Sequence, residues 1–134
     1  MVTKYYLNLV AGNLLRTKTS PAIPTTYYLG LLRSPPSVQD GNVEEPSGGS
    51  YARVAMTGMS TPTDGVIKNR SEIAFAEATA NWGSCSYVGV FDAATGGNLL
   101  MYSPLPTVKY VMSGDQARFK ANSITFTIAA AATN

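Results

Sequence analysis

The sequence has no histidine and only one cysteine in 134 residues. Histidine is the commonest general base and metal ligand near neutral pH, so its absence removes Ser–His and Cys–His nucleophile pairs and most hydrolase mechanisms. The single thiol, Cys85, excludes an intramolecular disulfide and a thiolate-rich metal site. Because Cys85 lies in a β-type run without a basic neighbour in sequence, we expect a buried core cysteine of low reactivity. No cofactor or metal is expected.

Charge and long apolar runs are also scarce. Ten basic and eight acidic residues make up 13% of the chain and leave a net charge of +2. They are scattered, so neither nucleic acid nor a membrane is indicated as a partner. No apolar run approaches the roughly 20 residues of a membrane-spanning helix. The segment Tyr5–Leu15 has the hydropathy of a signal-peptide core, but Asn8 and Asn13 interrupt it, and we do not expect secretion by this route.

The acidic residues give little sign of catalysis. A glycosidase needs two carboxyl groups about 5 to 10 Å apart, whereas seven of the eight acidic residues lie in or beside turn-like segments, where solvated surface is the default. The segment Asp40–Glu45 carries oxygen ligands for weak Ca²⁺ binding but lacks the ordered spacing of a calcium loop, so a plain acidic loop is favoured and calcium binding stays open. We therefore expect a protein that is not an enzyme.

The residues that are present predict one globular domain over residues 1–134. Apolar residues make up 45% of the chain, and its length is close to the commonest domain size. Within this domain we expect an N-terminal helix over residues 1–17, best bounded by Val2 and Arg16. A long acidic loop rich in proline, glycine and serine is expected over residues 34–50, and a flexible tail over residues 129–134. The helix prediction rests on apolar residues at spacings of three and four, namely Val2, Tyr6, Leu9, Val10 and Leu14.

Nine short segments rich in β-forming residues, separated by turn signals, are the candidates for about seven or eight strands. These segments are Tyr27–Arg33, Tyr51–Thr57, a pair around Val66–Ile67 and Glu72–Ala76, Ser84–Ala93 with Leu99–Ser103 as its hairpin partner, Val108–Val111, Gln116–Ala121 and Ile124–Ile128. A turn at Asn122-Ser123 is expected to join the last two strands as a hairpin. The fold predicted is mainly β, a β-sandwich or jelly-roll-like body with a short N-terminal α-helix.

Two of these segments carry further expectations. Between Tyr51 and Thr57, Ala52, Val54 and Met56 are expected on the core face, with Tyr51, Arg53 and Thr57 on the polar face. Pro104 and Pro106 either end the strand before them or place it at a sheet edge, because proline has no amide hydrogen for the ladder.

The chain has eight tyrosines, which can stack on sugars or on a partner surface. Core and cross-strand packing is the alternative explanation for most of them. We expect exposure of several, among them Tyr5, Tyr27, Tyr51, Tyr87, Tyr102 and Tyr110. The candidate contacts for a partner or for assembly are Tyr5, Tyr6, Leu9, Tyr51, Arg53, Tyr87 and Tyr102.

Three segments, in this order, resemble small virion proteins of tailed bacteriophages that are usually labelled tail fibre protein: PAIPTTYYLGLLRSPP, EEPSGGSYARVAM and NWGSCSYVGVFDAATGGNLLMYSPL. Members of that family look alike in a short N-terminal helix, a YxGL strand, a Gly-Gly-x-Tyr-Ala-Arg segment, a Trp-Gly followed by GxFDAATGGNLL, and a closing Ser-Gly-Asp hairpin. All five have counterparts here, and the resemblance covers nearly the whole chain. The first helix departs from the pattern, with Lys-Tyr-Tyr-Leu where acidic and asparagine residues are common.

The resemblance implies a virion structural protein, made in the cytoplasm of the host bacterium. It implies a tail-fibre or tail-associated component that acts by assembly and adhesion, contacts other virion proteins and forms a homo-oligomer, with a trimer as our specific prediction. A capsid decoration or cement protein and a module that binds host-surface glycans remain alternatives. The residues agree with a scaffold role. Gly48, Gly49 and Ser50 permit a sharp turn. Arg53 is placed to bind a neighbouring carboxylate, and Asp92 is placed to accept hydrogen bonds from turn amides.

Overall fold

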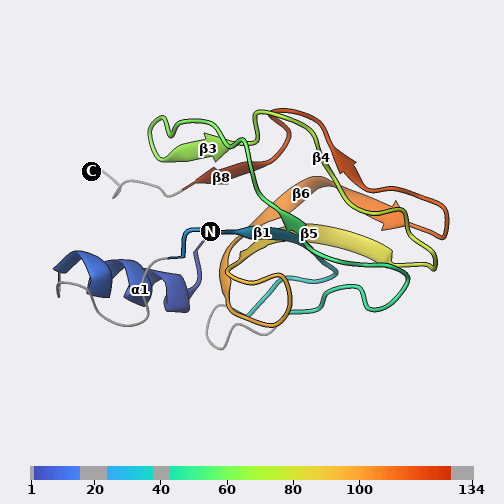
Figure 1. Ribbon diagram of the computed structural model, residues 1–134, viewed down its shortest axis with the longest axis horizontal. Coiled ribbons are helices and arrows are strands. Elements are labelled where there is room, and N and C mark those ends of the chain that lie inside the picture. The colour runs from blue at the N-terminus through green and yellow to red at the C-terminus, as the bar shows by residue number, and fades with distance from the viewer. Residues whose placement is uncertain (1, 16–23, 38–42, 128–134) are drawn as a thin grey trace.

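A central β-sheet, two small β-sheets and one helix make up the fold of the computed structural model, which describes residues 2–15, 24–37 and 43–127 (Figure 1). The predicted mainly β class with a short N-terminal helix is confirmed. The jelly-roll arrangement and the single-domain division stay predictions. In chain order the elements are α1 (Lys4–Leu15), β1 (Tyr28–Leu32), β2 (Val54–Ala55), β3 (Val66–Lys68), β4 (Ile73–Ala74), β5 (Gly83–Phe91), β6 (Leu99–Val111), β7 (Arg118–Phe119) and β8 (Thr125–Thr127).

Thr3 sets the start of α1. Its hydroxyl accepts a hydrogen bond from the Tyr6 amide at 3.3 Å, as an N-cap residue does, and donates to the Leu99 carbonyl at 2.7 Å. The helix therefore begins at Lys4 and not at Val2, which instead forms an isolated bridge with Met101. This corrects the predicted helix start; the predicted end at Arg16 and the boundary at residue 17 lie outside the described residues.

The central sheet has the strand order β2-β1-β5-β6, with all neighbours antiparallel. The predicted β5–β6 hairpin is confirmed, and Asp92 binds its turn by accepting a hydrogen bond from the Asn98 amide at 2.7 Å. The separate strand predicted at Val108–Val111 is wrong, because β6 continues through Pro104 and Pro106 to Val111. Strand β6 lies at the edge of the sheet, so the two prolines are tolerated within it, because a residue on the open side needs no amide hydrogen for a neighbouring strand.

The two small sheets pair β3 with β8 and β4 with β7. This corrects the predicted pair of strands around residues 66–76 and the predicted final hairpin. The turn at Asn122 exists, but the strands on either side of it pair with β4 and β3 and not with each other. Two bent segments, residues 66–74 and 118–127, therefore run antiparallel over their whole length. Ile128, the predicted last residue of the closing strand, and the tail over residues 129–134 lie outside the described residues.

Asn69 joins these two bent segments where their pairing changes. Its side chain is fully buried, donates to the Ser71 carbonyl at 3.0 Å and the Lys120 carbonyl at 2.8 Å, and accepts from the Ile124 amide at 2.9 Å. The side-chain amide thus replaces the ladder hydrogen bonds that are missing between the two small sheets.

The central sheet is covered differently on its two faces. One face packs against the two small sheets and forms the main core, which includes Leu29, Leu31, Phe75, Trp82, Cys85, Val88, Val90, Leu100, Phe119 and Phe126. The other face carries a smaller cluster of Leu32, Phe91, Leu99 and Tyr102, against which Val43 and Tyr87 pack. The buried position predicted for Cys85 is confirmed.

The segment predicted as the strand Tyr51–Thr57 is regular only at Val54–Ala55. Val54 and Met56 pack against the main core as predicted, but the other positions differ. Ala52 is exposed, whereas Tyr51 and Arg53 are turned toward the protein interior. Alternation alone failed here because the side chains of Tyr51 and Arg53 find buried polar partners, which a pattern of apolar and polar residues does not show.

We predict that Asn69→Ala lowers the free energy of unfolding by about 3 kcal/mol, because it leaves a buried amide and buried carbonyls without partners. Urea unfolding monitored by tryptophan fluorescence measures this change, since the only tryptophan, Trp82, lies in the main core. Arg70→Ala, at the exposed neighbouring position, serves as the control and should change the value by less than about 0.5 kcal/mol. Equal effects of both substitutions would contradict the role of Asn69.

Candidate functional site

A buried ion pair between Glu45 and Arg53 forms the centre of the candidate site. Arg53 donates from Nε to Glu45 Oε1 at 3.0 Å and from Nη2 to Glu45 Oε2 at 2.7 Å, a bidentate arrangement. Only 7% of the Arg53 side chain and 17% of the Glu45 side chain are exposed. The carboxylate partner expected for Arg53 is therefore Glu45, and the pair lies inside the protein.

The remaining guanidinium nitrogen of Arg53 reaches the turn between β5 and β6. Nη1 donates to the Ala93 carbonyl and to the Gly96 carbonyl, each at 2.7 Å, and the guanidinium lies 3.5 Å from the centre of the Phe91 ring. A cation over an aromatic face is favourable, particularly where water is excluded. Arg53 thus fastens the segment that carries Glu45 to the β5–β6 turn, so that two of the three segments with family resemblance meet at this residue.

Tyr51 links the ion pair to the main core. Its hydroxyl donates to Glu45 Oε1 at 2.6 Å and accepts from the Leu31 amide at 3.0 Å. This amide lies on the edge of β1 that β2 does not reach, since β2 pairs only with Tyr28 and Leu29. The Tyr51 ring meets Trp82 edge-on, with 5.2 Å between ring centroids. Burial, together with the hydrogen bond to Glu45, raises the pKa of the Tyr51 hydroxyl far above its usual value.

Two glycines make room for this network. A Cβ at Gly30 would lie 2.8 Å from Glu45 Oε1 and 2.9 Å from the Phe91 ring, so only a residue without a side chain fits there. Gly49 has a φ of 58° and its carbonyl accepts a hydrogen bond from Trp82 Nε1 at 2.8 Å. The sharp turn predicted at residues 48–50 is confirmed, and it brings Tyr51 toward Trp82.

The predicted contact residues divide into three separate groups. Tyr51 and Arg53 belong to the network around Glu45. Tyr87 and Tyr102 lie together on the second face of the sheet, with ring centroids 6.2 Å apart, and Tyr102 is buried.

The third group, Tyr5, Tyr6 and Leu9, comes from α1, and Leu9 is buried against the body. Among the tyrosines expected to be exposed, Tyr102 is buried, so that expectation is wrong. Packing against Trp82 explains the position of the Tyr51 ring, and packing against Tyr87 explains that of Tyr102. That these residues contact a partner stays a prediction.

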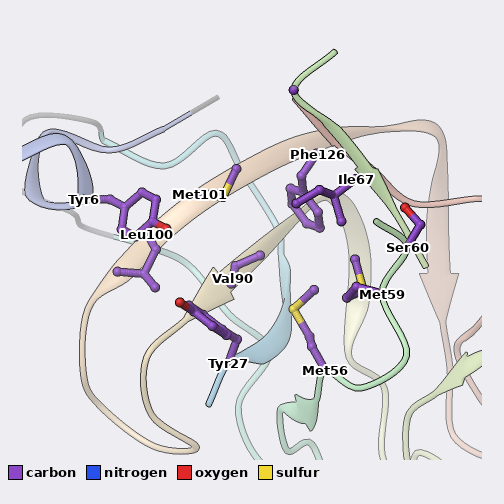
Figure 2. A pocket seen from close by; sticks show the side chains of 11 residues that line it. Tyr6, Tyr27, Met56, Met59, Ser60, Ile67, Val90, Leu100, Met101 and Phe126 are labelled. Atoms are coloured by element: carbon purple, nitrogen blue, oxygen red, sulfur yellow. The ribbon is translucent and has the colours of Figure 1, made fainter. Parts of the chain in front are cut away.

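An apolar pocket of about 360 Å³ lies between the start of α1, the central sheet and the β3–β8 sheet. Figure 2 shows Met56, Met59 and Met101 around it, with Tyr6 on one side and Phe126 on the other. Burial raises the pKa of the Tyr27 hydroxyl here, and the neighbouring Tyr6 hydroxyl adds to this effect. The lining has few polar groups, so it suits an apolar side chain better than a sugar, whose hydroxyls need convergent hydrogen-bonding partners.

The ionisable groups outside this network are the remaining candidates for a metal site or a reactive thiol in the described part of the chain. In the described ranges no three residues of the histidine, cysteine, aspartate and glutamate types gather as metal ligands. Burial raises the pKa of the Cys85 thiol, which disfavours the reactive thiolate. Of the segment Asp40–Glu45 that was considered for Ca²⁺, residues 40–42 lie outside the described residues. Glu44 accepts a hydrogen bond from the Ser34 hydroxyl, and Glu45 is engaged by Arg53.

Sequence reasoning missed Glu45 and Asn69 as network residues. The residues around Glu44 and Glu45 do not show which of the two binds Arg53, because only the fold of the loop places Glu45, and not Glu44, beside the guanidinium. Asn69 follows a short β-type segment and gives no signal of its own, since a buried amide with satisfied hydrogen bonds has no periodicity.

Among the described residues, no helix is long and apolar enough to cross a membrane.

A protein-family comparison matches residues 2–127, and the matching family is described as podophage GP4 fiber I protein gp80. The match covers all the elements of the fold and both segments that meet at Arg53. A search of curated proteins finds no match.

We predict that Arg53→Ala lowers the free energy of unfolding by about 3 kcal/mol, because Glu45 is left as a buried charge without its partner. Arg118→Ala is the matched control, since the Arg118–Glu72 pair has a similar distance but is about half exposed on both sides. The control should lose less than about 1 kcal/mol. Chemical denaturation of both variants measures the difference; a loss at Arg53 no greater than at Arg118 would show that the buried pair does not stabilise the fold.

We predict that alkaline pH reduces the stability that Tyr51 contributes. Its pKa is raised in the folded state, so the contribution is complete below the unfolded pKa of about 10 and falls as pH rises above it. The difference in unfolding free energy between the wild type and Tyr51→Phe should therefore shrink by up to about 1.4 kcal/mol per pH unit above pH 10. Denaturation at several pH values between neutral and alkaline tests this, and a difference that stays constant above pH 10 would contradict the raised pKa of Tyr51.

Proposed function

The chain belongs to the podophage GP4 fiber I protein family, and from this premise we propose that it is a tail-associated fibre component that acts by assembly. The family identifies a structural fibre component of a phage virion, which associates with other virion proteins. Its place at the tail and its assembly as a homo-oligomer, with a trimer as the specific form, are part of the proposal.

The network around Glu45 is the observation that supports a scaffold role. The polar atoms of Glu45, Tyr51 and Arg53 bind each other or backbone groups of the same chain. Within the described residues, every buried side-chain nitrogen and oxygen has a hydrogen-bond partner. Groups that are satisfied inside the protein hold segments in place and are not presented to a substrate, so we propose that the protein is not an enzyme.

Adhesion to the host through glycans is the less supported part of the proposal. The residues proposed to stack on sugars include Tyr51 and Tyr102, whose rings are engaged in packing with Trp82 and Tyr87. The apolar pocket beside α1 also lacks the polar lining that a sugar needs. Contacts with protein surfaces therefore fit the described part of the chain better than contacts with glycans.

We predict that purified virions contain this chain at a small fraction of the copy number of the major capsid protein. Fibres attach at a few symmetric positions, whereas a decoration protein covers sites over the whole capsid. Quantitative mass spectrometry of virions, with isotope-labelled peptides from both proteins, measures the ratio. A ratio near one would replace the fibre proposal with capsid decoration, and absence from virions would overturn both.

A further inference from the structure

The outward face of α1 carries three large apolar side chains, which is unusual for a helix on a protein surface. The exposed fractions are 54% for Leu7, 74% for Leu14 and 80% for Leu15, whereas Leu9 on the opposite face is buried. Leu14 was expected to share the packed face with Leu9, but α1 extends away from the sheets and its last turn has no support from them (Figure 1). A helix that is apolar on both faces is normally covered on both.

A second apolar surface lies at the far end of β6. Val108, Tyr110 and Met112 alternate along the chain and have exposed fractions of 39%, 69% and 48%. The intervening residues point the other way, since Val111 is buried in the main core and Lys109 Nζ lies 4.9 Å from the centre of the Phe119 ring. The second face of the central sheet is thus covered near Phe91 but left open at this end.

These two surfaces hold all the large hydrophobic side chains that are exposed in the described residues. They lie at opposite ends of the long axis of the molecule, with α1 at one end and the C-terminal end of β6 at the other (Figure 1). We call them the helix patch (Lys4, Leu7, Leu14 and Leu15) and the strand patch (Val108, Tyr110, Met112 and Asp115). Exposed apolar patches with charged residues at their rims are typical of protein interfaces.

The charged residues at the rims indicate that the helix patch binds the strand patch. Lys4 is the charged residue of α1, and it is exposed. The strand patch carries the exposed carboxylate of Asp115, which accepts a hydrogen bond from the Met112 amide at 2.9 Å. Two helix patches, or two strand patches, offer each other no opposite charge, because Lys4 is the charged residue of one patch and Asp115 that of the other. Pairing a helix patch with a strand patch brings opposite charges together, which favours association and orients it.

We propose that copies of this chain associate head to tail, with the helix patch of one copy on the strand patch of the next. This inference rests on the proposed assembly as a homo-oligomer and assigns its surfaces. The two surfaces of such a contact differ, so each copy has one free surface until the arrangement closes into a ring or continues as a filament.

Complementation between two variants tests the head-to-tail contact. One variant, Leu14→Asp with Leu15→Asp, disables the helix patch, and the other, Tyr110→Asp with Met112→Asp, disables the strand patch. Light scattering after size-exclusion chromatography should give an oligomer for the wild type and a single-chain mass for each variant alone. An equimolar mixture should give twice that mass, because the intact helix patch of one variant still binds the intact strand patch of the other.

Lys68→Asp is the matched control, because it places the same new charge at an exposed position of β3 outside both patches, and it should keep the wild-type mass. Thermal unfolding should be unchanged in all variants, since every substituted side chain is exposed; serine replaces aspartate at any position where folding suffers. Three results would each overturn the proposal. The wild type could have a single-chain mass, either variant could keep the wild-type mass, or the mixture could show no association. The count of copies in virions tests the fibre role separately, so the two can fail independently.

Discussion

Glu45 and Arg53 share two hydrogen bonds beneath a loop, and the covering of the second face of the central sheet near Phe91 depends on them. A buried ion pair stabilises a fold only when its remaining polar atoms are also satisfied. Here Tyr51 and the carbonyls of Ala93 and Gly96 satisfy them. The pair therefore holds the loop, the β5–β6 turn and the Phe91 cluster in one arrangement.

The two faces of the central sheet are stabilised by different physical means. The main core relies on apolar burial against two small sheets, and these sheets are kept in register by the single amide of Asn69. The second face relies on the polar network and on glycines at Gly30 and Gly89, where a Cβ would meet neighbouring side chains within 3 Å. Because that network reaches only one end of the sheet, the other end stays open and presents Tyr110. The proposed assembly surface thus lies where the internal covering stops.

The strengths and failures of the sequence predictions have clear physical causes. The β5–β6 hairpin was predictable because Asp92 and the paired glycines specify a turn between neighbouring strands, which is local information. The partners of β7 and β8 were not predictable, because pairing with β4 and β3 depends on contacts across about 50 residues of chain. Tyr51 and Arg53 were placed on a polar face, whereas the fold of the preceding loop brings Glu45 to both and makes their burial favourable.

The sequence by itself determined the mainly β class, the N-terminal helix, the buried single thiol and the resemblance to phage fibre proteins. These follow from residue types, short-range periodicity and the order of motifs, all of which can be read along the chain. Tertiary structure alone decided that Glu45 and not Glu44 binds Arg53, that Leu14 is exposed, and that the two apolar patches lie at opposite ends. These are facts of relative position in space, which arise only when distant segments pack and exclude water together.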